Sequence, residues 1–304
     1  MADTLATPAS ITTQPRVPPV RPEFERDLPP VEEPGEIVHP LSLWERLANV
    51  DGVRRGLILI ALMALWQAYA VMLGNPLMFP TLTDTLAALV EGVREGTLIL
   101  RILSSLQVLL IGYAIGIALA AVLTSLAVSF RLGADLLATL TAMFNPLPAI
   151  ALLPLALLWF GLGTASLVFV IVHSVTWAVA LNTQTGFHSV PDTQRLAGQN
   201  YGLKGLRYVA LILIPAAFPS ILAGLKIGWA FAWRTLIAAE LVFGASSRSG
   251  GLGWYLFEKR NQLETPAVFA GLTCVIIIGL VVEGLVFRTL EARTVHRWGM
   301  TRAG

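Results

Sequence analysis

The sequence predicts an all-α integral membrane protein with about six transmembrane helices. Of its 304 residues, 55% are hydrophobic and only 13% are charged, whereas soluble proteins have about 45–50% apolar and about 25% charged residues. The mean hydropathy is +0.71. Apolar runs of spanning length recur along the chain, and each crossing of a bilayer requires roughly 20 such residues. A chain of this composition therefore folds with lipid as its main solvent.

Residues 1–40 differ from the rest of the chain and contain nine of its 18 prolines. Such a segment lacks the apolar surface that offsets the entropy of ordering, so we expect a disordered, proline-rich tail. It is not typical of a secretory signal, because no apolar stretch occurs before residue 56. Residues 41–55 predict an interfacial lead-in helix, since Trp44, Arg54 and Arg55 suit the boundary between lipid and water.

The membrane domain is expected over residues 56–290, followed by a tail of residues 291–304. The less apolar, charged segment 76–101 predicts a helix outside the bilayer. Asparagine and two prolines between residues 145 and 148 interrupt the third apolar run. An interrupted span frees backbone groups, which either line a cavity or belong to a packed kink. The six predicted spans cover residues 56–74, 103–129, 136–160, 164–185, 216–243 and 266–288.

The distribution of basic residues predicts the orientation, because cytoplasmic loops carry an excess of Lys and Arg. Six spans place both termini on the same side of the membrane. That side then holds 14 of the 21 basic residues, against five on the opposite side and two within the spans. We therefore expect both termini, and the loop of residues 186–215, in the cytoplasm.

The loop 186–215 carries a pattern that an ordinary connection does not need. Pro191 and Asp192 are typical of a helix start, since Pro is accepted in the first turn and Asp complements the positive helix end. Gly202 is typical of a helix stop, which predicts a short helix of about ten residues. Pro215, with a second proline four residues later, predicts the turn into the fifth span. The short helix either joins two spans or presents a surface that another protein binds.

The spacing around this helix resembles the EAA motif of the permease subunits of bacterial ABC importers. In that motif Glu-Ala-Ala is followed by three residues, Gly, nine residues, Ile, one residue and Leu-Pro. Here Gly202, Ile212, Ile214 and Pro215 fall on this spacing, with Ile in place of Leu. The acidic residue of the motif is absent. The Glu-Ala-Ala positions are occupied by Leu196, Ala197 and Gly198.

Three further segments resemble the nitrate, sulfonate and taurine uptake permeases within this family. They are residues 145–163, 221–244 and 250–261, and the resemblance as a whole covers roughly residues 56–300. It implies the type I ABC importer permease fold, a place in the bacterial inner membrane and a transport role rather than catalysis.

The resemblance also implies the partners. Two copies of the chain would form a homodimer with one path, and two copies of a separate ABC ATPase would carry the ATP and Mg²⁺. A periplasmic or lipid-anchored solute-binding protein would deliver the ligand. No cofactor, metal ion or nucleic acid is expected on this chain. The implied ATPase-docking surface consists of Leu196, Ala197, Gly198, Tyr201, Gly202, Leu203 and Lys204.

Polar and ionisable residues within the spans are costly and therefore indicate function. Lys226 and Arg234 on the fifth span, and Asn145 and His173 on the third and fourth, are candidates for a path that admits a small anion. Each has a structural alternative: Lys226 can bind backbone carbonyls, and Asn145 and His173 can serve a kink or an interhelical bond. Glu240, near the end of the fifth span, is expected to pair with a cation.

The chain lacks the motifs of nucleotide binding and hydrolysis. None of its three lysines follows a glycine, as a phosphate-binding loop requires, and its four histidines lack the zinc-protease spacing. Energy must therefore come from another chain or from an ion gradient. An ion-coupled secondary transporter is the alternative, since broken helices and buried charges suit that class as well.

Overall fold

The computed structural model describes residues 49–243 and 250–296. The chain divides into two units, residues 1–56 and 57–304, which are treated separately. The predicted tail of residues 1–40 and most of the lead-in segment lie outside the described residues, as does the end of the C-terminal tail. In the first unit the chain is already helical from Asp51, which forms an ion pair with Arg54 at 2.5 Å.

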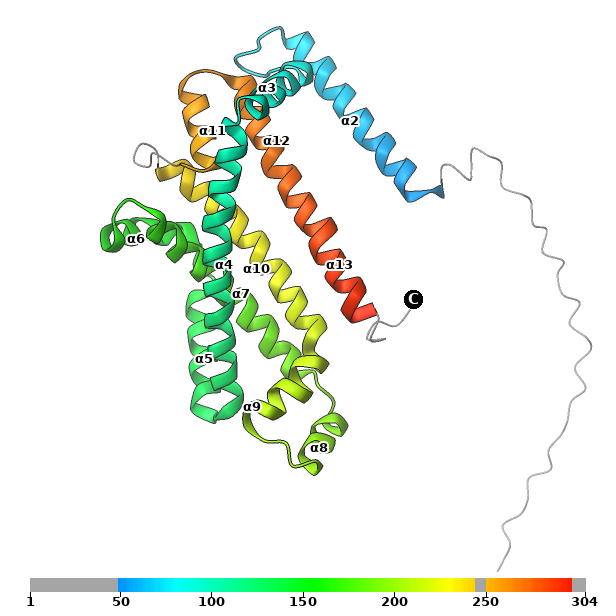
Figure 1. Ribbon diagram of the computed structural model, residues 1–304, viewed down its shortest axis with the longest axis vertical. Helices are drawn as coiled ribbons and strands as arrows, with labels where there is room; N and C mark the ends of the chain where they lie inside the picture. Colours follow the sequence, from blue (N-terminus) through cyan, green and yellow to red (C-terminus); the bar gives the residue numbers. More distant parts are fainter. Residues whose placement is uncertain (1–48, 244–249, 297–304) are drawn as a thin grey trace, which may run out of the picture. The chain divides into compact units, whose positions relative to one another are not determined.

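The described chain is built of helices with short connections (Figure 1). Segments of 3-10 or π geometry carry the label η. In chain order the elements are α2 (Asp51–Leu73), α3 (Leu82–Arg94), α4 (Thr97–Ser129), α5 (Arg131–Phe144), η1 (Ala149–Leu152), α6 (Leu153–Phe160), α7 (Thr164–His188), α8 (Asp192–Asn200), α9 (Gly205–Tyr208), η2 (Val209–Leu213), α10 (Ile214–Phe243), α11 (Leu252–Asn261), α12 (Thr265–Val281), η3 (Val282–Phe287), α13 (Arg288–Glu291) and η4 (Ala292–His296).

Five helical segments of the described chain are long and apolar enough to cross a membrane, and a bent pair provides a sixth candidate. This confirms five of the predicted spans. The bent pair corresponds to the third span, which was predicted over 136–160 with an interruption between residues 145 and 148. The chain there bends by 88° between α5 and the helical segment Ala149–Phe160. Pro146 and Pro148 lie in the bend, and their missing N–H groups and ring positions explain why the helix breaks there.

Two other boundaries differ from the predictions. The helix expected in segment 76–101 is α3, but α4 begins at Thr97, so Arg101 belongs to the second span. The last helical run continues through η4 to His296, past the predicted start of the C-terminal tail at residue 291. In both places the helix extends beyond the apolar run, because hydropathy marks the lipid-facing part of a helix and not its ends.

The prediction that Pro215 marks the turn into the fifth span is also wrong. Helical structure begins ten residues earlier, at Gly205, and runs through α9 and η2 into α10. The π-helical segment η2 ends two residues before Pro215. A π turn is one of the local adjustments by which a helix accommodates a residue that cannot donate a backbone hydrogen bond.

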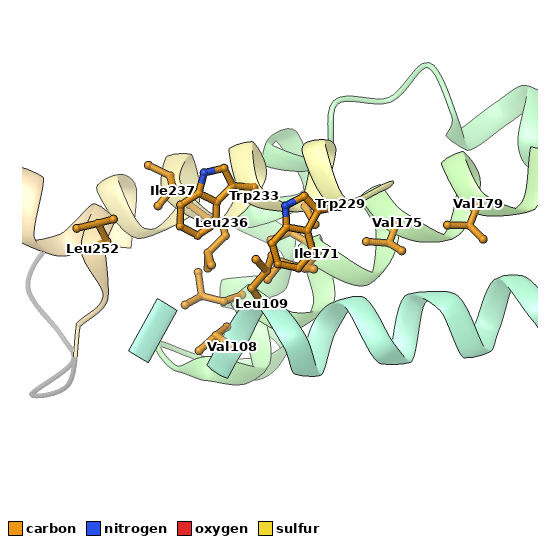
Figure 2. Close-up of a cluster of buried hydrophobic side chains, with 14 of the residues drawn as sticks. Val108, Leu109, Ile171, Val175, Val179, Trp229, Trp233, Leu236, Ile237 and Leu252 are labelled. Carbon is orange, nitrogen blue, oxygen red and sulfur yellow. The ribbon is translucent and has the colours of Figure 1, made fainter. Parts of the chain in front are cut away.

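The core of the second unit lies where α4, α7 and α10 pack together (Figure 2). Half of the most apolar stretch of α7 is buried, against 22% in α4. Polar bonds also cross between spans: for example, Tyr113 donates to the Leu225 carbonyl at 2.8 Å, and Trp233 Nε1 donates to the Val275 carbonyl at 3.2 Å. Figure 2 labels Val108 and Leu109 of α4, Ile171, Val175 and Val179 of α7, Trp229, Trp233, Leu236 and Ile237 of α10, and Leu252 of α11.

Candidate functional site

The short helix predicted in the loop is α8, nine residues long. Pro191 precedes it in an extended conformation, and Asp192 occupies its first turn. At its end Gly202 adopts a φ of 71°, which favours glycine. The N–H of Gly202 donates to the Gln199 carbonyl at 2.9 Å, and that of Leu203 to the Gly198 carbonyl at 3.1 Å. This pair of bonds is a Schellman motif, so the predicted helix and its glycine stop are confirmed.

Two contacts fasten α8 to the membrane helices. The Arg195 guanidinium donates from Nε to the Val190 carbonyl at 3.1 Å and from Nη2 to the Phe187 carbonyl. The Phe187 carbonyl belongs to the last turn of α7, where carbonyls have no partner within the helix and a cation is favourable. The second contact is made by Gly198 of α8, which is buried against Tyr208 and Ile212. An added Cβ on Gly198 would lie 2.9 Å from Ile212 Cγ1 and 3.1 Å from the Tyr208 ring. A displacement of α8 therefore acts on both α7 and η2.

The expected docking residues do not all share one environment. Leu196 is 57% exposed and Tyr201 is 86% exposed. Ala197, Gly202 and Lys204 are also exposed, and Leu203 is half-buried. Gly198 differs, because it faces the chain's own Tyr208 and Ile212. We use "docking face" for Leu196, Ala197, Tyr201, Gly202, Leu203 and Lys204.

A cavity of about 370 Å³ lies where the break after α5 faces α7 and α10. It brings together three of the four candidate path residues: Asn145 from the break, His173 from α7 and Arg234 from α10. We call it the central cavity. Neither Asp nor Glu lines it. Thr235 and Ser174 also line it, and sequence reasoning did not select them, although Thr235 directly follows Arg234.

Aromatic packing fixes the position of His173 in the cavity wall. The Trp177 indole donates to His173 Nδ1 at 3.1 Å, and it stacks on Phe144 with ring centroids 5.4 Å apart and 13° between the planes. Because Nδ1 accepts, the proton of a neutral imidazole is assigned to Nε2. Nε2 is buried and forms no hydrogen bond of ordinary geometry within the described residues.

Arg234 gives the central cavity its positive charge. Its Nε donates to the Ala230 carbonyl at 3.0 Å, and its guanidinium lies 5.1 Å from the centroid of the Phe231 ring. These contacts hold the side chain but leave its charge uncompensated, since the ion pairs of the described chain do not include Arg234. A positive wall without carboxylates favours an anion.

Lys226 lies elsewhere. Its Nζ forms an ion pair with Glu283 Oε1 of η3 at 3.0 Å, in a second cavity of about 450 Å³ between α10 and the last helical run. Arg234 lines both cavities. The positive charge of Lys226 is therefore compensated, and the structure separates it from Asn145 and His173.

Sequence reasoning missed the partners of Glu240. The ion pairs of the described chain do not include Glu240, and the cation Arg101 of α4 acts on it only from a distance. The carboxylate instead accepts hydrogen bonds from the Ser105 hydroxyl and from the backbone N–H of Gly253. These partners come from α4 and α11, and Ser105 lies 135 residues away in the sequence. The anchoring role of Arg195 was missed too, although a basic residue shortly after a helix end is a known partner for the last carbonyls.

Comparison with known proteins identifies the family. Residues 112–294 match the profile of the binding-protein-dependent transport system inner membrane component. The chain belongs to this family. The matched segment contains α8, Asn145, His173 and Arg234. The chain is therefore a permease subunit of an ABC importer and a multi-pass membrane protein, and membership implies an ATPase and a solute-binding protein as partners.

Three relatives show how far the similarity extends. A putative ABC transporter permease protein of Methanocaldococcus jannaschii is 32% identical over 221 residues, 71% of this chain and 80% of the relative. The taurine transport system permease protein of Escherichia coli is 30% identical over 248 residues, 78% and 86% of the two chains. The nitrate import permease protein of Synechocystis is 26% identical over 238 residues, 76% and 85%.

Proposed function

We propose that this permease conducts a small anion of the sulfonate, taurine or nitrate class through a path that includes the central cavity. The observation that carries the proposal is the uncompensated guanidinium of Arg234 in a cavity without carboxylates. Two relatives are named for taurine and for nitrate, both of which carry an anionic group. Binding cavities range from about 300 to 1,000 Å³, and a cavity of about 370 Å³ suits a small anion.

The broken third span supports the same assignment. In transporters, discontinuous helices expose backbone groups beside the substrate site, because irregular backbone in a bilayer must line a cavity or be buried in protein. The break contributes Asn145, which can donate from its amide. Arg234 supplies the charge, and Asn145 and His173 supply neutral polar groups that orient the anion.

In this proposal the docking face of α8 binds a separate ATPase. Tyr201 is aromatic and 86% exposed, and tyrosine is enriched among the residues that anchor interfaces. The exposed Leu196 adds apolar surface beside it. Gly198 has another role: it permits the close approach of α8 to Tyr208 and Ile212. Because Leu196 stands where the EAA motif has Glu, the interface with the ATPase depends on shape and apolar contact at that position.

The assembly that follows contains two copies of the permease around one path and two copies of the ATPase, which bind ATP and Mg²⁺. A solute-binding protein delivers the anion from the opposite side of the bacterial inner membrane, and both termini of the permease lie in the cytoplasm. In this proposal the chain acts in transport alone, and catalysis and cofactors belong to the ATPase. ATP-driven closure of the ATPases displaces α8, which shifts the permease between inward-open and outward-open states.

The test is uptake by the purified complex in proteoliposomes, with labelled taurine and nitrate offered in turn. We expect uptake that requires ATP and persists when ion gradients are collapsed. Arg234→Gln should raise KM about tenfold, the effect of losing one charge-assisted hydrogen bond. Arg131→Gln is the matched control, because Arg131 is exposed at the start of α5 and lies away from the cavity. Uptake that follows an ion gradient, or equal KM values for the two variants, contradicts the proposal.

A further inference from the structure

A buried carboxylate joins three helices at the end of α10 that lies farthest from α8. Glu240 is only 4% exposed. Its oxygens accept hydrogen bonds from Ser105 Oγ of α4 at 2.8 and 2.9 Å, and Oε2 also accepts from the backbone N–H of Gly253 at 2.7 Å. Ser105 Oγ in turn accepts from the N–H of Leu252 at 2.7 Å. We call Glu240, Ser105 and these two N–H groups the α11 clamp.

The clamp replaces the usual cap of a helix. The first N–H groups of a helix have no partner within it, and a Ser, Thr, Asp or Asn just before the helix normally accepts one of them. Gly251 stands at that position in α11 and has no side chain to offer. Side chains of α4 and α10 satisfy the first two N–H groups instead, and the carboxylate lies at the positive end of the helix.

The glycines of α11 make this contact possible. A Cβ on Gly251 would overlap Glu240 Oε1 and Ser105 Oγ. A Cβ on Gly253 would lie 2.6 Å from both Glu240 Cβ and the Ile237 carbonyl oxygen. The glycine-rich stretch 250–253 therefore lets the backbone of α11 lie directly on α10. Its conformation is set by the clamp.

A second tie runs between α4 and α11, one turn away from Ser105. Arg101 Nη1 donates to the Gly250 carbonyl at 2.8 Å, and Nη2 donates to Glu258 Oε2 at 3.3 Å. Ser105 and Arg101 are four residues apart and lie on the same side of α4. The start of α11 is thus fixed in two ways: its first two N–H groups bind Ser105 and Glu240, and the carbonyl of Gly250 just before the helix binds Arg101.

The clamp also borders a cavity. Glu240, Gly250 and Gly251 line a space of about 450 Å³ together with Gln107 of α4 and Trp254 of α11. A shift of α11 relative to α4 would change the width of this space. The same shift would separate the Gly253 N–H from the Glu240 carboxylate and the Leu252 N–H from Ser105 Oγ. This is costly because buried polar groups depend on their hydrogen bonds.

We propose that Glu240 is a positioning residue of the transport cycle, which makes α11 move together with α10 and α4. Gly198 of α8 packs on η2 at the start of this helical run, Arg234 lies in the central cavity, and Glu240 follows six residues later. A displacement of α8 that moves η2 and α10 then also moves α11, and with it the wall of the cavity beside α11. This inference rests on the proposed function, since it requires the ATPase to displace α8.

The experiment uses the complete transporter in proteoliposomes, with spin labels at exposed positions Val122 of α4 and Gln262 after α11 in a Cys274→Ala background. The variants are Ser105→Ala and Glu240→Gln, which keeps the shape but loses the charge and replaces one acceptor oxygen by an NH₂ donor. Glu91→Gln is the control, because Glu91 is exposed on α3. The measurements are the label-to-label distance with and without ATP, and the amount of anion transported per ATP hydrolysed.

The labelled chain is assembled with an unlabelled copy of the permease, so that only distances within one copy are measured. We expect one narrow distance in the parent protein, unchanged by ATP. In Glu240→Gln and in Ser105→Ala the distance should broaden with ATP, and transport per ATP should fall about tenfold through loss of the buried hydrogen bonds. The double variant should be no worse than the more affected single variant, because both remove the same network. Glu91→Gln should behave as the parent.

Three results overturn the inference: an ATP-dependent distance change in the parent, unchanged transport per ATP in both single variants, or variants that assemble poorly but transport normally per assembled complex. The last result would assign the clamp to stability alone. A parent complex that shows no ATP-dependent transport would instead contradict the proposed function. This result distinguishes a failure of the proposed function from a failure of the inference about Glu240.

Discussion

Two charged anchors, one at α8 and one at α11, use opposite chemistry. At the α8 end, the Arg195 guanidinium donates to the Phe187 carbonyl in the last turn of α7 and to the Val190 carbonyl just beyond that helix. At the α11 end, the Glu240 carboxylate accepts N–H groups at the N-terminal end of α11. Each charge complements the helix end that it meets. The first anchor leaves an exposed face, whereas the second is buried, so the α8 end is suited to a partner and the α11 end to transmission within the chain.

The largest effect is expected at the exposed end. Tyr201→Asp should abolish binding of the ATPase, because a charge at the centre of an apolar interface costs about 2–4 kcal/mol, a loss of at least thirtyfold. Insertion of the permease into the membrane should be unchanged. The measurement is the ATPase recovered with the affinity-purified permease, together with ATP-dependent uptake.

The control for Tyr201→Asp is Thr193→Asp, a charge in the exposed first turn of α8, where the helix end favours it. Equal recovery of the ATPase with both variants would show that the docking face lies elsewhere and would remove the contrast between the two ends.

Gly251→Ala at the clamp is expected to destabilise the permease by about 3 kcal/mol, the upper range for overpacking. The new methyl group would overlap the Glu240 carboxylate and the Ser105 hydroxyl, and both are fixed by hydrogen bonds. Thermal unfolding of the solubilised protein measures the effect. Gly284→Ala is the control, because an added Cβ meets nothing within 4 Å there. A Gly251→Ala protein as stable as the control would mean that α11 is not held as described.

Gly198→Ala at the α8 end should cost less, about 1 kcal/mol, because a side-chain carbon can shift more easily than a bonded carboxylate. The added Cβ would lie 2.9 Å from Ile212 Cγ1. The same unfolding measurement applies, and Ile212→Ala in the same chain should relieve the crowding. If Gly198→Ala destabilises as strongly as Gly251→Ala, the α8 end is as rigid as the clamp.

Arg195→Gln is expected to have a similarly small effect, about 1 kcal/mol, because the two carbonyls it leaves can bind water. Hydrogen exchange of the α8 amides should accelerate about fivefold in this variant, since the helix separates more often from the end of α7. Arg207→Gln, exposed on α9, should leave the exchange rates unchanged. Equal rates in both variants would show that packing at Gly198 alone holds α8.

Features that depend on residues close together in the sequence could be predicted, whereas those that depend on distant residues could not. The start of α8 near Pro191 and its stop at Gly202 depend on backbone conformations a few residues apart, so the sequence predicted both. Five spans follow from apolar length in the same way. Pro215 misled the prediction, because a π turn before it lets the helix continue where a break was expected.

The interactions that sequence could not reveal are long-range. The partners of Glu240 are 13 and 135 residues away, and no local pattern marks Ser105 among the residues of an apolar helix. The central cavity is a similar case, since Asn145, His173 and Arg234 come from three different segments and only the 88° bend brings the first of them inward. Their selection rested on the cost of polar groups in lipid, which identifies candidates but does not place them together.

The central claim is that this chain is the membrane subunit of an ATP-driven assembly, in which an ATPase binds α8. The most direct measurement is to solubilise the native membrane gently, purify the chain and determine the stoichiometry and activity of any ATPase recovered with it. We predict an ATPase in equal amount to the permease, with ATP hydrolysis in the preparation. Recovery of the chain alone, under conditions that keep a known ABC complex intact, would contradict the claim.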